Sequence, residues 1–242
     1  MNKKKILLTV CALVLLVAIT VTGTLAYLTA STENQAVKNT FVAAGGGNII
    51  DPDNTRAPDD VKDENGTDVT LEDGFFLVEN KYSYNAATLS YDKEDTEYVT
   101  GNNYDNAAPG MEIGKNPKLT ADIETGAAAY VFIEIVDGTQ GNITAKIADV
   151  WTELSGVSKH TGGKVYVYNG GNFITGGDTV EINGISLLKE DKITVKNFTG
   201  VSDVVDTNTT TEGLQLGNLT FYAYACQAQG FENAADAYNA CF

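Results

Sequence analysis

The stretch Ala129–Val136, with the sequence AYVFIEIV, decides the fold class of this 242-residue chain. Its aromatic and β-branched residues, such as Tyr130, Phe132 and Ile133, favour a β-strand. The run is almost entirely apolar and Gly138 ends it, which is typical of a strand buried in a core. The chain is therefore expected to be built around a β-sheet.

Further strand-like segments lie on both sides of this one, and glycine and asparagine turns separate them. The clearest turn is Asn169-Gly170-Gly171, and Asn172–Thr175 is expected to begin the hairpin partner of the preceding strand. Strands do not alternate with helices, so the pattern predicts an all-β antiparallel sandwich. The expected strands are one or two within Gly74–Tyr91, then Lys118–Ile123, Lys164–Tyr168, Thr179–Ile182, Ile185–Leu188, Lys192–Phe198 and Leu219–Cys226.

Two segments have helical rather than strand character. In Ile143–Leu154 apolar residues recur about every 3.6 residues, which predicts a short helix. Phe231–Cys241 is rich in alanine, and its aromatic residues share one helical face, so a short C-terminal helix is expected there. The segments Asp51–Asp73 and Asp92–Asn106 are predicted to be loops, the first with a hairpin signal at Asn65-Gly66.

Residues 1–26 have the form of a secretory signal peptide. Lys3–Lys5 precede a long apolar run and small residues follow it, so cleavage is expected between Ala26 and Tyr27. The alternative is an uncleaved membrane anchor, in which the lysines would hold the N-terminus inside. In both cases residues 27–242 are expected to be exported as a single domain, either secreted or held at the cell surface.

The chain is strongly acidic, with 32 Asp and Glu residues against 16 Lys and Arg residues and a net charge of −16. Nucleic-acid phosphates are bound by Lys and Arg, so no nucleic-acid partner is expected. The charge also disfavours anionic membrane surfaces, which leaves an uncleaved N-terminal segment as the expected membrane contact. The excess acid fits a solvated surface, and it would also suit cations or basic partners.

The N-terminal part of the exported chain has the features of a strand on a tether. Residues 27–43 form a strand-capable arm, in which Val37, Phe41 and Val42 are the apolar positions. Residues 44–47 include consecutive glycines and are expected to act as a hinge, because glycine resists ordering. The arm would then be free to leave its own body.

Two cysteines, Cys226 and Cys241, remain once residues 1–26 are removed. A pair of cysteines close together in an exported chain is a candidate disulfide. The alternative is a pair of buried thiols. Two cysteines and one histidine do not make a zinc site, so no metal centre is expected from them.

No catalytic signature stands out, and we expect neither an enzyme nor a cofactor. The single histidine, His160, lies in a turn-like stretch and is expected to be a surface loop residue. There is no His-Glu-x-x-His pair for zinc and no Gly-x-Ser-x-Gly elbow for a nucleophile. Two alternatives stay open, a catalytic triad that uses His160 and a carboxylate pair of the glycosidase type, but no residue points to either of them.

The best ligand candidate is calcium, bound loosely by the acidic loop that contains Asp51, Asp53 and Asp63. Asp63 begins a short Asp-x-Asn-Gly stretch that half-fits an EF-hand loop. Counted in that register, however, the first ligand position is Val61, where a carboxylate is required. The alternative is an acidic loop that is simply solvated.

Several segments resemble the TasA/camelysin (CalY) family of exported proteins, which the specialised signal peptidase SipW processes. The most specific of them combines the expected cleavage region, Gly23–Thr29, with a short motif that follows it, Asn39-Thr40-Phe41. The others are similar to a strand pair and to the closing strand and helix of that family. They are Pro109–Ile113 with Asn116-Pro117 and Ala129–Val131, and Phe221–Ala225 with Gln227–Phe231.

The resemblance implies a jelly-roll β-sandwich from a Gram-positive-type bacterium. In fibre-forming members the N-terminal segment is freed by the signal peptidase and inserted into the next subunit as a donated strand. The chain is therefore expected to be a subunit of an extracellular fibre or biofilm matrix, with itself or related matrix subunits as partners. The alternative is a strand that pairs in its own sheet, in a non-polymerising adhesin or binding module. The metalloprotease activity associated with camelysins is the least favoured function, because the chain has one histidine.

Overall fold

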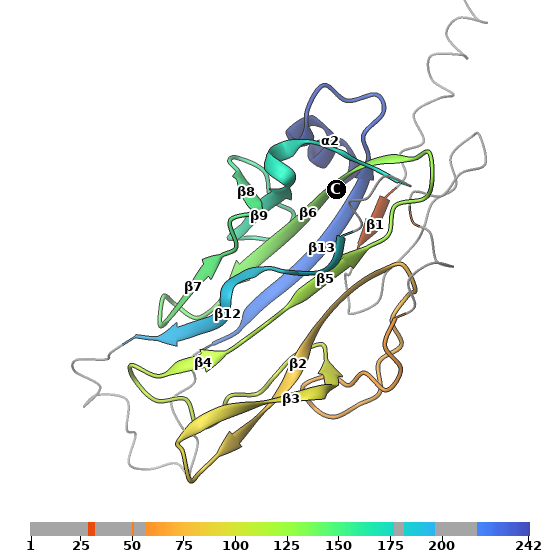
Figure 1. Ribbon diagram of the computed structural model, residues 1–242. Coiled ribbons are helices and arrows are strands. Elements are labelled where there is room, and N and C mark those ends of the chain that lie inside the picture. Colours follow the sequence, from red (N-terminus) through yellow and green to blue (C-terminus); the bar gives the residue numbers. More distant parts are fainter. Residues whose placement is uncertain (1–28, 32–49, 51–56, 177–181, 197–216) are drawn as a thin grey trace, which may run out of the picture.

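The computed structural model describes residues 29–31, 50, 57–176, 182–196 and 217–242 (Figure 1). Most of these residues lie in antiparallel strands, so the predicted all-β class is confirmed. The predicted signal segment at 1–26 and the glycine hinge at 44–47 lie outside the described residues.

The largest sheet contains the strand from which the fold was predicted. That strand, β6, pairs with β13 at every position from Leu219↔Asp137 to Gln227↔Ala129. The order across the sheet is β1-β13-β6-β9-β8, and β10 also pairs with β6. Its strands are β1 (Thr29–Ser31), β6 (Ala128–Asp137), β8 (Trp151–Leu154), β9 (Gly163–Tyr168), β10 (Ile174–Thr175) and β13 (Leu219–Gln227).

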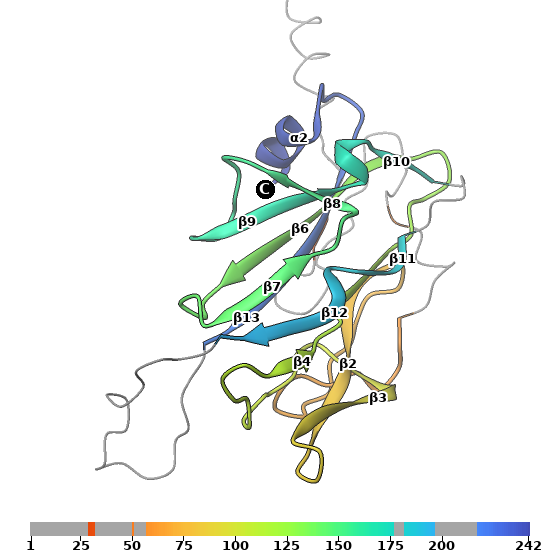
Figure 2. The ribbon, with the colours of Figure 1, turned by 60° about the vertical axis from the view of Figure 1, so that its left-hand side comes forward.

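Two smaller sheets complete the β structure, and Figure 2 shows them beside the largest one. One has the order β11-β5-β2-β3 and the other has the order β4-β12-β7. Their strands are β2 (Phe75–Asn85), β3 (Ser90–Val99), β4 (Glu112–Gly114), β5 (Lys118–Ala121), β7 (Ile143–Ile147), β11 (Ile182–Ser186) and β12 (Leu188–Val195).

The main core lies between the largest sheet and the sheet that contains β2 and β5. Because side chains alternate along a strand, Val131, Ile133 and Ile135 point to one face of β6. They share a buried cluster with Phe75 of β2 and Leu119 of β5. This is face-to-face packing of sheets, which is the arrangement of a β-sandwich.

The opposite face of β6 is covered by the α-helix α2 (Ala234–Cys241), shown in Figure 1. Asn233 caps the helix by accepting a hydrogen bond from the backbone N–H of Asp236. Ala237 and Tyr238 are buried against the sheet, in a cluster that includes Phe132. The predicted C-terminal helix is therefore confirmed, with its start a few residues later than expected.

The predicted helix over Ile143–Leu154 is wrong, because the segment forms strands β7 and β8 with a turn between them. Its apolar residues do not share one buried face: Val150 is 42% exposed, whereas Trp151 is buried and donates its indole N–H to the carbonyl of Ser186. The long-range partners of β7 and β8 therefore override the local helical spacing.

Two other predictions need correction. The segment Asp92–Asn106 is not entirely a loop, since β3 continues through it to Val99. Its charged residues stay solvated because β3 lies at the edge of its sheet. The strand after Asn169–Gly171 is β10, which pairs with β6 and not with the preceding strand β9.

Candidate functional site

The first candidate site is the edge of the largest sheet, where β1 pairs with β13. The antiparallel register is Thr29↔Cys226, Ala30↔Ala225 and Ser31↔Tyr224. The sequence assigned strand character to the later part of the arm, around Val37, Phe41 and Val42, and those residues lie outside the described part of the chain. The described strand begins just after the predicted cleavage position between Ala26 and Tyr27, inside the predicted arm of residues 27–43 but ahead of its apolar positions.

The composition of β13 differs from that of the edge strand β3. β13 (LTFYAYACQ) contains no charged residue, whereas the edge strand β3 (SYDKEDTEYV) carries a series of them. Charged side chains on an edge strand protect it from pairing with another chain. β13 lacks this protection, and β1 lies against the edge that would otherwise end the sheet.

The second candidate site is a buried carboxylate beneath α2. Glu134 of β6 is fully buried on the helix-covered face, and its Oε1 accepts the backbone N–H groups of Lys159 (3.0 Å) and His160 (2.9 Å). Its Oε2 lies 2.9 Å from His160 Nδ1 and accepts hydrogen bonds from the hydroxyls of Tyr224 (3.1 Å) and Tyr238 (3.3 Å). One carboxylate thus joins β6, β13, α2 and the 159–160 loop.

His160 lies in a loop, as the sequence predicted, but its side chain is packed and only partly exposed. Its ring stacks on Tyr222 of β13 at a centroid distance of 4.0 Å, and its side chain is only 30% exposed. The backbone of the following turn also lies close to the carboxylate, because a Cβ atom at Gly163 would collide with Glu134 Oε1. The histidine therefore belongs to the packing of the helix-covered face.

The hydrogen bonds around Glu134 determine its charge state. Burial alone would raise the pKa of the Glu134 carboxyl, but the hydrogen bonds from the backbone and ring of His160 and from Tyr224 outweigh burial and lower that pKa below its ordinary value. The carboxylate is therefore ionised at neutral pH and stabilises the fold in that form.

A carboxylate that orients a histidine is also part of a catalytic triad. The neighbours described around Glu134 are backbone N–H groups, the His160 ring and two tyrosine hydroxyls. These donors satisfy a buried charge, as buried charges in proteins require. The geometry is therefore accounted for by a structural role that locks α2 and β13 to the sheet.

A second buried polar cluster lies between the sheets. Lys115 Nζ is 3.0 and 3.1 Å from the two carboxylate oxygens of Glu79, and the residues are 7% and 4% exposed. The ammonium also lies 5.7 Å from the ring centroid of Tyr104 and 5.6 Å from that of Phe221. The pair joins β2 to the segment between β4 and β5 and to β13.

Beside this pair, Asn116 and Asn80 exchange two hydrogen bonds: Asn116 Nδ2 donates to Asn80 Oδ1 and the Asn80 backbone N–H donates to Asn116 Oδ1. Burial, and then the charges of Asp191 and Glu79, raise the pKa of the nearby Tyr82 to about 12. Asn116 belongs to a segment that carried the family resemblance, and its role here is to hold β2 in place.

The calcium candidates are not brought together in the part of the chain that the structure describes. Asp51 and Asp53 lie outside it. Asp63 Oδ1 accepts the backbone N–H groups of Asn65 and Thr67, and the bond from Thr67 is the main reason that the pKa of Asp63 is lowered. Among the described residues, no group of three or more His, Cys, Asp or Glu side chains is arranged to hold a metal ion.

The two cysteines are joined in the structure, and the disulfide ties the last turn of α2 to β13. The Cα atoms of Cys226 and Cys241 are 6.5 Å apart. Cys226 is fully buried, and it is also the residue of β13 that lies opposite Thr29 of β1. The disulfide therefore lies at the point where the first candidate site meets the helix-covered face.

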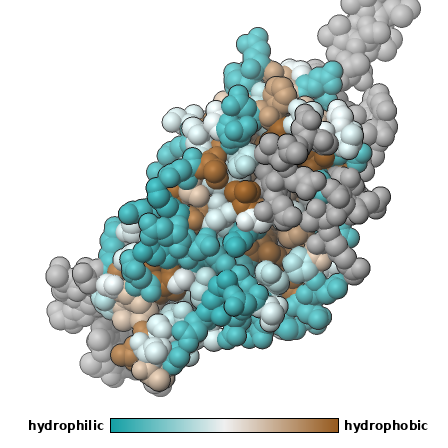
Figure 3. Space-filling model, in the orientation of Figure 1, coloured by the Kyte–Doolittle hydropathy of each residue, from teal (hydrophilic) through white to brown (hydrophobic). Residues whose placement is uncertain are grey.

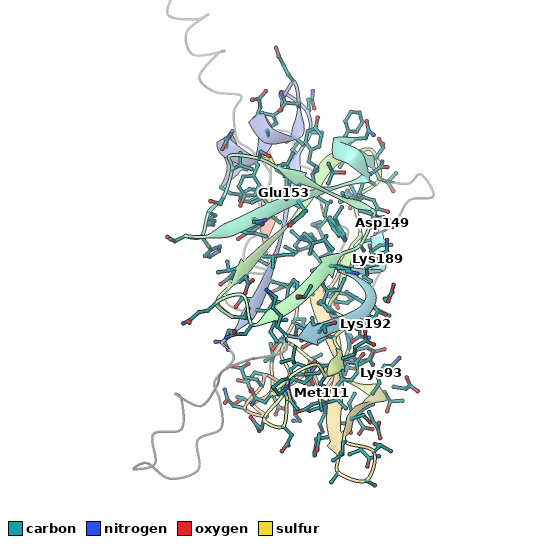
Figure 4. The ribbon with its side chains drawn as sticks, turned by 90° about the vertical axis from the view of Figure 1, so that its left-hand side faces the viewer. Lys93, Met111, Asp149, Glu153, Lys189 and Lys192 are labelled. Atoms are coloured by element: carbon teal, nitrogen blue, oxygen red, sulfur yellow. A yellow bond between two sulfur atoms is a disulfide. The ribbon has the colours of Figure 1, made fainter. Side chains whose placement is uncertain are left out.

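The surface around these sites is mostly hydrophilic on the face shown in Figure 3. Ion pairs on the protein surface are exposed, as for Lys189 Nζ and Asp149 at 2.8 Å, which Figure 4 labels.

Among the described helices, none is long and apolar enough to cross a membrane. Comparisons with protein-family models, curated proteins and solved structures found no match to this chain.

Proposed function

We propose that this chain is an exported structural subunit of an extracellular fibre or matrix. In this proposal a signal peptidase cuts after Ala26, and the strand that begins at Thr29 pairs with β13 of the next copy. The observation that carries the proposal is the pairing of β1 with β13 at the end of the largest sheet. The subunit body would be a jelly-roll variant of the β-sandwich, as the family resemblance implies.

The pairing geometry supports strand exchange for a simple reason. Strand addition uses main-chain hydrogen bonds for affinity, and those bonds are the same whether β1 comes from the same copy or from a neighbour. The exchange therefore loses no ladder bond. A donor at one end of the molecule and an acceptor edge on the next copy make a head-to-tail contact, and such contacts produce open filaments when they do not close into rings.

The composition of the acceptor strand also supports the proposal. An uncharged strand such as β13 can accept a partner without desolvating a charged side chain. Its inward-facing residues, including Ala223 and Ala225, are fully buried and form part of the main core. A donated strand would therefore pair with a rigid template rather than with a loose surface segment.

A double proline variant tests the pairing that carries this proposal. Successive backbone N–H groups of a strand point to opposite sides, so Thr29→Pro/Ala30→Pro removes at least one donor that faces β13. We expect no filaments by electron microscopy and no protein in the high-speed pellet. The control, Thr29→Ala/Ala30→Ser, keeps both N–H groups and should assemble like the wild type. Filaments of normal length from the proline variant would overturn the proposal.

A further inference from the structure

We propose that the Cys226–Cys241 disulfide is a redox-sensitive cross-link that holds β13 in the conformation that pairs with an N-terminal strand. In the oxidised chain α2 is locked onto the sheet and the β1–β13 ladder is stable. After reduction α2 separates and the ladder weakens. The effect on assembly rests on the proposed function, whereas the coupling between α2 and the ladder does not.

The first argument is the position of Cys226. It is fully buried on β13, its sulfur is bonded to Cys241 in α2, and its backbone lies opposite Thr29 of β1. One residue therefore belongs both to the covalent link with the helix and to the ladder with the N-terminal strand. A change in the position of the helix acts directly on the paired segment.

The second argument is that α2 needs the link. A helix that spans only Ala234–Cys241 is far shorter than the roughly 12–15 residues at which isolated helices become even marginally stable in water. Its buried residues are two alanines and Tyr238, which offer little apolar area apart from the tyrosine ring. The covalent link limits how far the helix can move from the sheet when these contacts open.

The third argument is what the helix covers. The Tyr238 ring packs edge-on against Phe132 at 5.3 Å and against Tyr224 at 5.9 Å, and its hydroxyl donates to Glu134. When α2 separates, Glu134 loses a hydrogen-bond donor and Tyr224 becomes exposed to water. Tyr224 is the residue opposite Ser31 of β1, so the loss reaches the other end of the short ladder.

The chemical step is thiol–disulfide exchange with a dithiol such as dithiothreitol. One thiolate of the reductant attacks a disulfide sulfur and forms a mixed disulfide, and its second thiolate releases the protein. The products are two protein thiols and the cyclic disulfide of the reductant. The dithiol supplies both electrons and both protons. Cys241 is the accessible end, since it is partly exposed whereas Cys226 is buried.

Hydrogen exchange followed by mass spectrometry tests this coupling on the chain that begins at Tyr27, with and without dithiothreitol. We expect reduction to speed amide exchange in α2 by about a hundredfold, the factor associated with a disulfide that closes a loop of this size. Amides of Thr29–Ser31 and Tyr224–Cys226 should also exchange faster, while the strand pair β2 and β3, which belongs to another sheet, stays unchanged. The variant Cys241→Ser should reproduce the reduced pattern without reductant.

Each other outcome overturns the inference. Faster exchange in α2 without a change at Thr29–Ser31 would mean that the helix and the ladder are not coupled. Unchanged exchange rates everywhere would mean that the disulfide stabilises neither α2 nor the pairing of β1 with β13. Faster exchange throughout the chain would mean that it stabilises the whole fold. The measurement needs no filaments, so a chain that shows the coupling but never assembles would contradict the proposed function alone.

Discussion

Replacing Glu134 with alanine is expected to lower the free energy of unfolding by about 3–5 kcal/mol, because several donors lose their acceptor at once and each buried polar group left unsatisfied costs about 1–3 kcal/mol. The substitution leaves the hydroxyls of Tyr224 and Tyr238 and the backbone N–H groups of Lys159 and His160 without their acceptor. Chemical denaturation followed by tryptophan fluorescence measures the change. Trp151 is the single tryptophan and lies in the same sheet, on β8.

The matched control is Glu153→Ala on β8, a glutamate of the same sheet whose side chain is 48% exposed and which Figure 4 labels. Exposed residues of this kind usually change stability little, so this variant should unfold at nearly the wild-type denaturant concentration. An equal loss of stability in both variants would contradict the role of Glu134. So would a Glu134→Ala variant as stable as the wild type.

The same residue should give the stability a defined pH dependence. The pKa of Glu134 is lowered in the folded state, so its contribution is fully present above the pKa of the unfolded chain. It is lost as the pH falls through the lower folded pKa, because the proton then binds the folded carboxylate. Glu134→Gln should therefore lose less stability than the wild type when the pH falls from neutral to below the ordinary carboxyl pKa of about 4.3.

Replacing Lys115 with alanine is the second substitution with a large expected effect. It leaves the Glu79 carboxylate buried between the sheets without its ammonium partner, and we expect a loss of about 3–5 kcal/mol. The double variant Lys115→Met/Glu79→Leu removes both charges and keeps the volume. It should recover most of the stability, because the desolvation penalty of both ions disappears.

Lys189→Ala provides the control for this pair, because Lys189 binds Asp149 at the surface, where such ion pairs contribute little (Figure 4). It should unfold like the wild type in the same denaturation experiment. If the double variant is less stable than Lys115→Ala alone, the fold requires the charges of Lys115 and Glu79 themselves, and this account is contradicted.

The strands that could be predicted from the sequence are those whose local composition and long-range packing agree. Ala129–Val136 and Leu219–Cys226 are apolar and rich in β-formers, and they become the central pair β6 and β13. The capped, alanine-rich segment near the C-terminus becomes α2. In Ile143–Leu154 local composition and long-range packing disagree. The spacing of its apolar residues suits a helix, but the segment forms two short strands that pair with distant partners.

The buried carboxylate could not be located from the sequence because its partners are far along the chain. Glu134 is separated by 26 residues from His160, by 90 from Tyr224 and by 104 from Tyr238. One signal was present: a single acidic residue in the middle of an otherwise apolar core strand must find donors when it is buried. That signal predicts a polar cluster but not its members, which depend on strand register and on the placement of α2.

The edge at β13 could be predicted only in outline. The sequence indicated an N-terminal arm with strand character but assigned that character to the apolar positions around Phe41. The described ladder involves the small and polar residues Thr29–Ser31. Strand pairing at an edge uses backbone groups, which every residue except proline provides, so side-chain pattern alone does not mark these positions.

The most direct test of the central claim compares the purified chain that begins at Tyr27 with the same chain carrying extra residues ahead of Tyr27, both examined by electron microscopy. If removal of residues 1–26 frees a strand that pairs with β13 of the next copy, the first protein forms filaments and the second stays monomeric. Monomers from both would contradict the fibre account and favour a non-polymerising adhesin. Filaments from both would contradict control of assembly by cleavage.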